Sequence, residues 1–149
     1  MRKAPLLFFI VVFMASCNNS QAAEITISIV DMTTSKIRVA ISNESNTALT
    51  VPLKFIPEDY YIRFEIIDAK GEKVQFIGKE IKFYPTHADY LAMEPHSSFE
   101  QSIELRKFYA MSNELYSIKA IYEVDELSRS EEGLWSGLAV STVEKLDLR

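Results

Sequence analysis

Hydrophobic and polar residues alternate with a period of two along most of the chain after Glu24. Successive side chains of a β-strand point to opposite faces, so this alternation predicts strands with one apolar and one polar face. Each run is short and bounded by turn-forming residues. The segments with this pattern are Ile25 to Ile29, Ile37 to Ile41, Leu49 to Phe55, Ile62 to Ile66, Val74 to Phe76, Phe99 to Leu105 and Tyr116 to Tyr122.

No segment carries a sustained apolar stripe with a period of 3.6 residues, so the pattern disfavours a helical domain. About seven to nine short strands separated by turns are typical of a two-layer antiparallel arrangement. The sequence therefore predicts an all-β fold, an antiparallel immunoglobulin-like β-sandwich.

The last strand changes phase within its length. Leu138 and Val140 share one parity, whereas Val143 has the other, and a bulge near Ser141 and Thr142 would reconcile the two. Just before this strand, Trp135 is expected to cover one end of the core.

Tyr116 opens a late strand and could be the tyrosine corner of an immunoglobulin-like fold. It could equally be one of 7 tyrosines that fill a β-rich core. The sequence leaves both interpretations open.

The N-terminal residues have the organisation of a secretory signal. Arg2 and Lys3 precede an unbroken apolar stretch from Leu6 to Ala15. That stretch has the length of a signal-peptide core and is well below the roughly 18–20 residues that span a bilayer. The segment therefore predicts export.

Met14-Ala-Ser-Cys17 resembles the lipobox of bacterial lipoproteins, with Met14 in place of the more usual leucine. The resemblance implies cleavage before Cys17 and acylation of its thiol, which attaches the chain to a membrane. The alternative is an ordinary secretory signal with a stray cysteine. The expected organisation is a signal peptide over 1–16, a lipidated tether over 17–23 and one domain over 24–149.

Asn18 follows the cysteine. By resemblance to lipoproteins of two-membrane bacteria, an aspartate there would favour the inner membrane, so Asn18 implies the outer membrane and favours its periplasmic side. The chain has 1 cysteine, so the domain cannot contain a disulfide of its own. Without Arg2 and Lys3 it carries 14 basic and 21 acidic residues, a formal charge of −7, which argues against nucleic acid as a partner.

Several stretches between Ser42 and Val124 together look like one type of small β-domain. They are Phe64 to Gly71, Val74 to Gly78, Pro85 to Pro95 and Ser98 to Tyr109. They resemble the immunoglobulin-like domain that precedes the catalytic domain in some deuterolysin-type zinc endopeptidases, and related free-standing bacterial domains described as proteinase-inhibitor-like. Leu134 to Gly137 and Val143 resemble the closing strand of small bacterial lipoproteins. The resemblance implies a fold more than an activity.

Such domains usually have glycine after the proline of one hairpin, whereas this chain has His96 after Pro95. Histidine adopts a positive φ more readily than most residues, so we expect the turn to be kept.

The sequence lacks the motifs of common catalytic and metal sites. The His-Glu-x-x-His motif that holds zinc in that protease family is absent, as are Gly-x-Ser-x-Gly and a glycine-rich phosphate loop. The two histidines, His87 and His96, flank Asp89 and Glu94, and these four could converge on a metal. A solvated loop beside a hairpin is the favoured interpretation, so we expect no enzyme, no cofactor and no metal.

These observations favour a membrane-anchored, non-enzymatic interaction module of the cell envelope, with an envelope protein as its partner. The alternative is a proteinase inhibitor, for which Ser128 to Glu131 is the candidate reactive loop. The aromatic stretches Asp59 to Tyr61 and Phe108 to Met111 could bind a partner or close the ends of the core.

Overall fold

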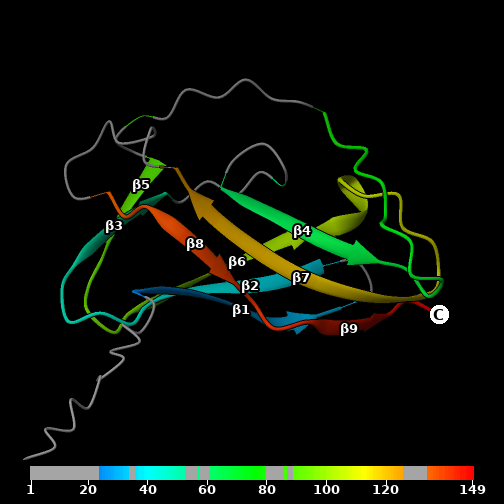
Figure 1. Cartoon of the computed structure of the whole chain (residues 1–149), viewed down its shortest axis with the longest axis horizontal. Helices are drawn as coiled ribbons and strands as arrows, with labels where there is room; N and C mark the ends of the chain where they lie inside the picture. Colours follow the sequence, from blue (N-terminus) through cyan, green and yellow to red (C-terminus); the bar gives the residue numbers. More distant parts are fainter. Residues whose placement is uncertain are drawn as a thin grey trace, which may run out of the picture.

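A computed structural model describes residues 24–33, 36–52, 57, 61–79, 86, 89–125 and 134–149. Within these residues the chain forms nine β-strands and one short 3-10 helix (Figure 1). The elements are β1 (Ile25–Met32), β2 (Lys36–Asn43), β3 (Leu49–Pro52), β4 (Ile62–Ile67), β5 (Tyr90–Met93), β6 (Ser98–Glu104), η2 (Leu105–Lys107), β7 (Leu115–Val124), β8 (Gly137–Val140) and β9 (Glu144–Asp147).

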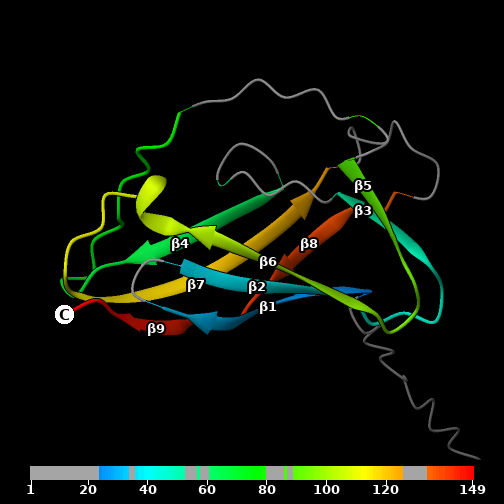
Figure 2. The ribbon, with the colours of Figure 1, turned by 180° about the vertical axis from the view of Figure 1, so that it is seen from behind.

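The strands form two main antiparallel sheets and a two-stranded ribbon. One sheet has the order β1-β2-β6, and the other has β4-β7-β8 with β9 also paired to β7. Strands β3 and β5 form the ribbon. Figures 1 and 2 show the two sheets as opposed layers. This order matches the A-B-E and C-F-G sheets of the immunoglobulin fold, so the predicted all-β sandwich is confirmed.

The hydrophobic core lies between the two sheets, because every second residue of the long strands faces inward. Ile37, Val39 and Ile41 of β2 are fully buried, as are Ile66 of β4 and Ile118 of β7. These residues have the parity that the alternation predicts for the apolar face.

A β-bulge in β1 changes which residues face the core. Ile29 pairs with Val39, but the next paired residue is Asp31, opposite Arg38, so Val30 is the extra residue. Strict alternation from Ile29 would turn Asp31 inward. The bulge turns Asp31 to the outside instead, and Met32 takes the inward position.

The last strand is interrupted near Ser141, as predicted, but Leu138, Val140 and Val143, whose phase suggested the bulge, are exposed, and Ala139 faces the core instead. Strands β8 and β9 both pair with β7, and Ser141 lies between them. The backbone N–H of Ser141 donates to the carbonyl oxygen of Ala120 at 2.9 Å, and its Oγ accepts from the N–H of Ala120, also at 2.9 Å. The buried hydroxyl thus replaces one step of the ladder where the strand changes phase.

Trp135 covers one end of the core, as predicted. Its ring stacks on that of Tyr122 with centroids 5.8 Å apart, and its exposed fraction is 9%. The indole also lies over Gly137, where an added Cβ would stand 2.8 Å from Cζ2 of the tryptophan. This close approach explains the glycine at that position.

Tyr116 forms a tyrosine corner. Its ring is buried at the start of β7, and its hydroxyl oxygen accepts from the backbone N–H of Ser112 at 2.7 Å. The hydroxyl also contacts the carboxylate of Glu114 at 3.0 Å. Of the two interpretations that the sequence left open, the corner is therefore the correct one.

Asn43 ends β2 and is fully buried. Its Nδ2 donates to the carbonyl oxygens of Thr47 at 2.8 Å and of Met93 and Glu94 at 3.1 Å each. Its Oδ1 accepts from the N–H of Ser45 at 3.0 Å and from the hydroxyl of Ser45 at 2.7 Å. One side chain thus holds the turn after β2 against the end of β5.

The turn between β5 and β6 keeps the geometry expected of it. His96 has a φ of 56°, and its Nε2 lies 3.0 Å from Oδ1 of Asn46. A histidine therefore occupies the left-handed position that glycine would otherwise take.

The segment around Val74 and Phe76, which the sequence predicts as a strand, forms only isolated bridges. The N–H of Val74 donates to the carbonyl of Ile66 in β4, and the rest of the segment bonds to the chain that follows η2: the N–H of Ile77 donates to Phe108, and the N–H of Ala110 donates to Gln75. Strand β5, by contrast, was not predicted, because four residues are too few for a clear alternation.

Candidate functional site

Two of the predicted sites lie outside the described residues. These are Cys17, the expected lipid attachment point, and the candidate inhibitory loop Ser128 to Glu131. Lipid anchoring and protease inhibition therefore stay predictions.

The candidate metal ligands are not brought together within the described part of the chain. His96 contacts Asn46, and Asp89 accepts hydrogen bonds from the N–H and hydroxyl of Thr86, both at 2.8 Å. His87 lies outside the described residues. Among the residues that the structure does describe, no group of three histidine, cysteine or acidic side chains could hold a metal.

The aromatic stretch from Phe108 to Met111 closes one end of the core. Tyr109 is buried, and its hydroxyl accepts from the N–H of Phe64 at 3.2 Å. The ring of Phe108 stacks on Phe76 with centroids 6.5 Å apart. The core-closing interpretation is therefore correct for Tyr109 and Phe108. In the other stretch only Tyr61 is described, and its carbonyl accepts from the N–H of Glu123 at 2.8 Å.

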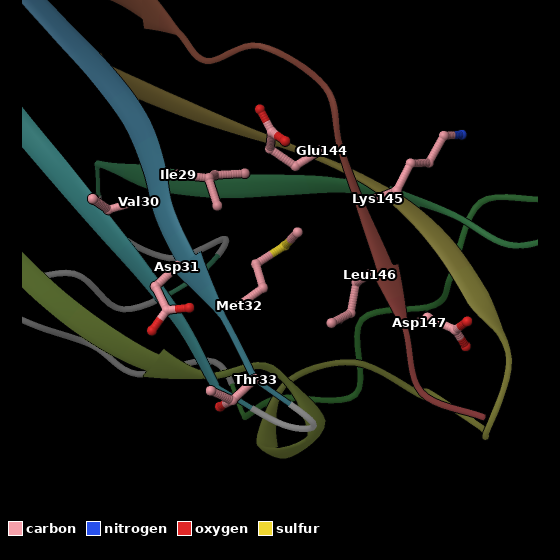
Figure 3. A pocket seen from close by; sticks show the side chains of 9 residues that line it. All are labelled: Ile29, Val30, Asp31, Met32, Thr33, Glu144, Lys145, Leu146 and Asp147. Carbon is pink, nitrogen blue, oxygen red and sulfur yellow. The ribbon is translucent and has the colours of Figure 1, made fainter.

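The best candidate site is a groove between β1 and β9 that sequence reasoning did not identify (Figure 3). It has a volume of about 400 Å³, within the range of about 300–1,000 Å³ that is typical of ligand sites. We call it the β1–β9 groove. It is lined by Ile29, Val30, Asp31, Met32, Thr33, Glu144, Lys145, Leu146 and Asp147.

Apolar side chains form the floor of the β1–β9 groove, although most of the surface that lines it is polar. The side chains of Met32 and Leu146 extend from opposite strands into the space between β1 and β9, and Ile29 lies further along β1 (Figure 3). Ile29 and Met32 are half-buried against the core, and Leu146 is buried. Met32 reaches this position because of the bulge at Val30. The groove is thus the place where the sandwich opens between its two sheets.

Charged side chains surround this apolar floor, and carboxylates predominate. Asp31, Glu144 and Asp147 line the groove with one base, Lys145. Arg149 neutralises one of these groups: its Nε and Nη2 donate to the carboxylate of Asp147 at 2.9 and 2.7 Å. These hydrogen bonds lower the pKa of Asp147 to about 2.

The two strands that border the groove are each paired on one side in the part of the chain that is described. β1 pairs with β2, and β9 pairs with β7, while β1 and β9 share no ladder. The facing edges of both sheets therefore carry backbone donors and acceptors that another strand could use.

The groove lies away from the point where the domain begins. The carbonyl of Glu24, just before β1, accepts from the N–H of Glu44 at 2.8 Å at one end of the sandwich. From Ile25 to Met32, β1 runs about 23 Å at 3.3 Å per residue. Figure 1 shows the start of β1 and the C-terminus at opposite ends, with β9 toward the C-terminal end.

Comparison with known proteins does not extend these findings. No protein-family model matches the sequence, and no curated protein matches it significantly. The resemblance to the deuterolysin-associated domain therefore stays a prediction. Among the described residues, no helix is long and apolar enough to cross a bilayer.

One signal in the sequence could have revealed the groove. Both strands that border it place a charged residue where the alternation expects an apolar one, at Asp31 in β1 and at Glu144 in β9. The first is moved outward by the bulge, and the second keeps its inward position. Broken alternation on two separate strands is a sign of sheet edges.

Proposed function

We propose that this chain is a lipid-anchored protein of the cell envelope whose β-sandwich is a non-enzymatic binding module. The observation that carries the proposal is the β1–β9 groove, an opening between two sheet edges with an apolar floor and a charged lining. A concave site in which polar groups can orient a ligand beside apolar side chains is a common form of binding site.

The sequence supports the proposed location of the module in the cell envelope. The apolar stretch from Leu6 to Ala15 and the following Cys17 favour export and acylation, and Asn18 favours the outer membrane, with the domain facing the periplasm. A tether over residues 17–23 spans at most about 25 Å when fully extended. The domain would therefore stay close to the bilayer.

The position of the groove suits a tethered module. The domain is joined to the tether at the Glu24 end, and the groove lies at the other end of β1. The groove would therefore lie at the end of the domain away from the membrane, where a partner could reach it. An envelope protein is the partner that this geometry favours.

Processing is tested by intact mass spectrometry of the protein extracted from membranes, together with cell fractionation. We expect a chain that begins at Cys17 and carries the mass of its acyl groups. The Cys17→Ala variant should lose the added mass and leave the membrane fraction. A full-length, unmodified chain in the cytosol would contradict the proposal.

Binding is tested by photo-crosslinking in intact cells, with a benzophenone amino acid at one position of the full chain at a time. We expect a discrete crosslinked envelope protein from Met32, in the groove, and none from Lys70, in an exposed turn. Absence of crosslinks from every position, in cells where the anchored protein is present, would count against a binding module.

A further inference from the structure

Glu144 occupies an unusual place in the β1–β9 groove. It pairs with Ile118, a fully buried residue, and shares its face of β9 with the buried Leu146. Its carboxylate therefore stands at an inward-facing position of an edge strand, at the border of the apolar floor (Figure 3). A carboxylate at such a position is stabilised when a cation approaches from the same side.

The described residues supply no such cation. The carboxylate of Glu144 accepts a hydrogen bond from the hydroxyl of Thr142 at 2.8 Å, and it forms no ion pair within the described chain. The neighbouring Lys145 turns away from the groove, and its ammonium group bonds to the hydroxyl of Ser117 (Figure 3). Arg149 is bonded to Asp147.

The other groove carboxylate is also only weakly neutralised. Arg38 lies 3.8 Å from Asp31 but 3.2 Å from Glu100, so its closer partner is outside the groove. The groove thus combines an apolar floor with a lining that has three carboxylates and one lysine. Charge complementarity favours a basic occupant.

We propose that the β1–β9 groove binds an extended polypeptide segment that adds as a further strand at the edge of a sheet. Its apolar side chains, spaced two residues apart, would contact Ile29, Met32 and Leu146. A lysine or arginine on the same face of the segment would pair with Glu144. This inference rests on the proposed binding function and names the chemistry of the partner.

The backbone supports a strand as the occupant. β1 and β9 border the groove with edges that are paired on one side only within the described residues, so an added strand would find backbone partners. Strand addition of this kind gains affinity from main-chain hydrogen bonds and specificity from pockets for alternate side chains. The groove offers apolar contacts at its floor beside the carboxylates of Asp31, Glu144 and Asp147.

Glu144 has a competing explanation. Inward-pointing charges on edge strands protect proteins against edge-to-edge association. If Glu144 served only that purpose, its replacement by glutamine would increase self-association and would leave the binding of a basic peptide unchanged. The two explanations therefore predict different outcomes for the same variant.

The test uses the full chain in detergent micelles and a fluorescein-labelled peptide, Thr-Val-Thr-Val-Thr-Lys-Thr-Val-Thr. Its valines and its lysine share one face of an extended strand. A control peptide, Thr-Val-Thr-Val-Lys-Thr-Thr-Val-Thr, has the same composition with the lysine on the other face. Fluorescence anisotropy gives the dissociation constant for each, and circular dichroism verifies the fold of each variant.

We expect the first peptide to bind about fivefold more tightly than the control, and the difference to disappear in Glu144→Gln. Glu65→Gln, a carboxylate variant on the outer face of β4, should behave as the wild type. Equal binding of the two peptides, or an unchanged difference in Glu144→Gln, would overturn the inference. So would the absence of binding by either peptide.

These outcomes are distinct from failure of the binding function itself. A crosslink from Met32 in cells would still support the module if the peptide experiment failed, and the occupant would then have another chemistry. Analytical ultracentrifugation of Glu144→Gln completes the comparison. Increased self-association with unchanged peptide binding would assign Glu144 to protection of the edge and overturn the inference.

Discussion

The two ends of β1 differ in how their polar groups are used. At the first end, Ile25 pairs with Asn43, whose buried amide makes five hydrogen bonds within the domain. At the other end, Met32 and Glu144 border an open groove, and among the described residues the carboxylate has only the hydroxyl of Thr142 as its partner. Both ends lie at the margin of a sheet, but only at the first end are the polar groups fully hydrogen-bonded within the domain.

This difference separates residues that maintain the fold from residues that are available to a partner. A buried amide with all its partners inside the domain stabilises one arrangement of the chain, because leaving any partner unpaired is costly. A carboxylate at a groove contributes little to folding. Variants at the two ends should therefore differ in their effects on stability.

The largest loss of stability is expected at Asn43. Asn43→Ala would leave the carbonyl oxygens of Met93 and Glu94 without their amide partner and would remove the acceptor used by Ser45. We expect the free energy of unfolding to fall by about 3 kcal/mol. Urea denaturation followed by circular dichroism measures it. A loss below about 1 kcal/mol would show that this end is not held by the amide.

The second largest loss of stability is expected at Ser141. In Ser141→Ala the N–H of Ala120 loses its hydroxyl acceptor inside the sheet, and we expect a loss of about 2 kcal/mol. Thr142→Ala, which removes an exposed hydroxyl one residue further on, is the matched control and should cost less than about 0.5 kcal/mol. Equal effects of the two substitutions in urea denaturation would contradict the role of the buried hydroxyl.

Tyr116→Phe keeps the ring and removes the hydroxyl of the corner. The N–H of Ser112 would lose its closest acceptor, so we expect a loss of about 1 kcal/mol in the free energy of unfolding. Thermal denaturation should show a correspondingly lower midpoint. An unchanged midpoint would mean that the ring alone, through its packing, supports the start of β7.

At the groove, Glu144→Gln should change the free energy of unfolding by less than about 0.5 kcal/mol, because the side chain keeps its size and can still contact Thr142. Urea denaturation beside Asn43→Ala gives the direct contrast between the two ends. A loss similar to that of Asn43→Ala would place Glu144 among the residues that maintain the fold.

The smallest expected effect is a loss of folding stability at low pH. The pKa of Asp147 is lowered from 3.8 to about 2 by its hydrogen bonds to Arg149. A lowered carboxyl pKa stabilises the folded state above the ordinary value, and this contribution is lost as the pH falls from about 4 to 2. In Arg149→Ala, an NMR titration should find the pKa of Asp147 near its ordinary value. An unchanged low pKa would contradict the assignment to Arg149.

Much of the fold could be predicted because it follows from local rules. Period-two alternation indicated the long strands, the phase change indicated the interruption at Ser141, and the position of Tyr116 allowed a tyrosine corner. The positive φ of His96 was expected from the resemblance to domains that usually have glycine at this place in the hairpin. Each of these features depends on neighbours in the sequence.

The groove could not be predicted in the same way, because it depends on which strands end up as sheet edges. Asn43 looks like a turn residue in the sequence, and its partners at Met93 and Glu94 are about fifty residues away. The bulge at Val30 is marked in the sequence only by the charged Asp31 where the alternation expects an apolar residue, and this does not tell which strand the groove would face. Contacts between residues far apart in the sequence therefore determine both the closed end of β1 at Asn43 and the open end at the β1–β9 groove.

The bulge at Val30 also makes this strand sensitive to changes in chain length. Deleting that one residue would restore strict alternation, bring Asp31 against the hydrophobic interior and expel Met32 to solvent. Substitution of the same residue would leave the phase intact. Relatives of this protein should therefore vary freely in the identity of the residue at this point while keeping the number of residues between Ile29 and Met32 constant.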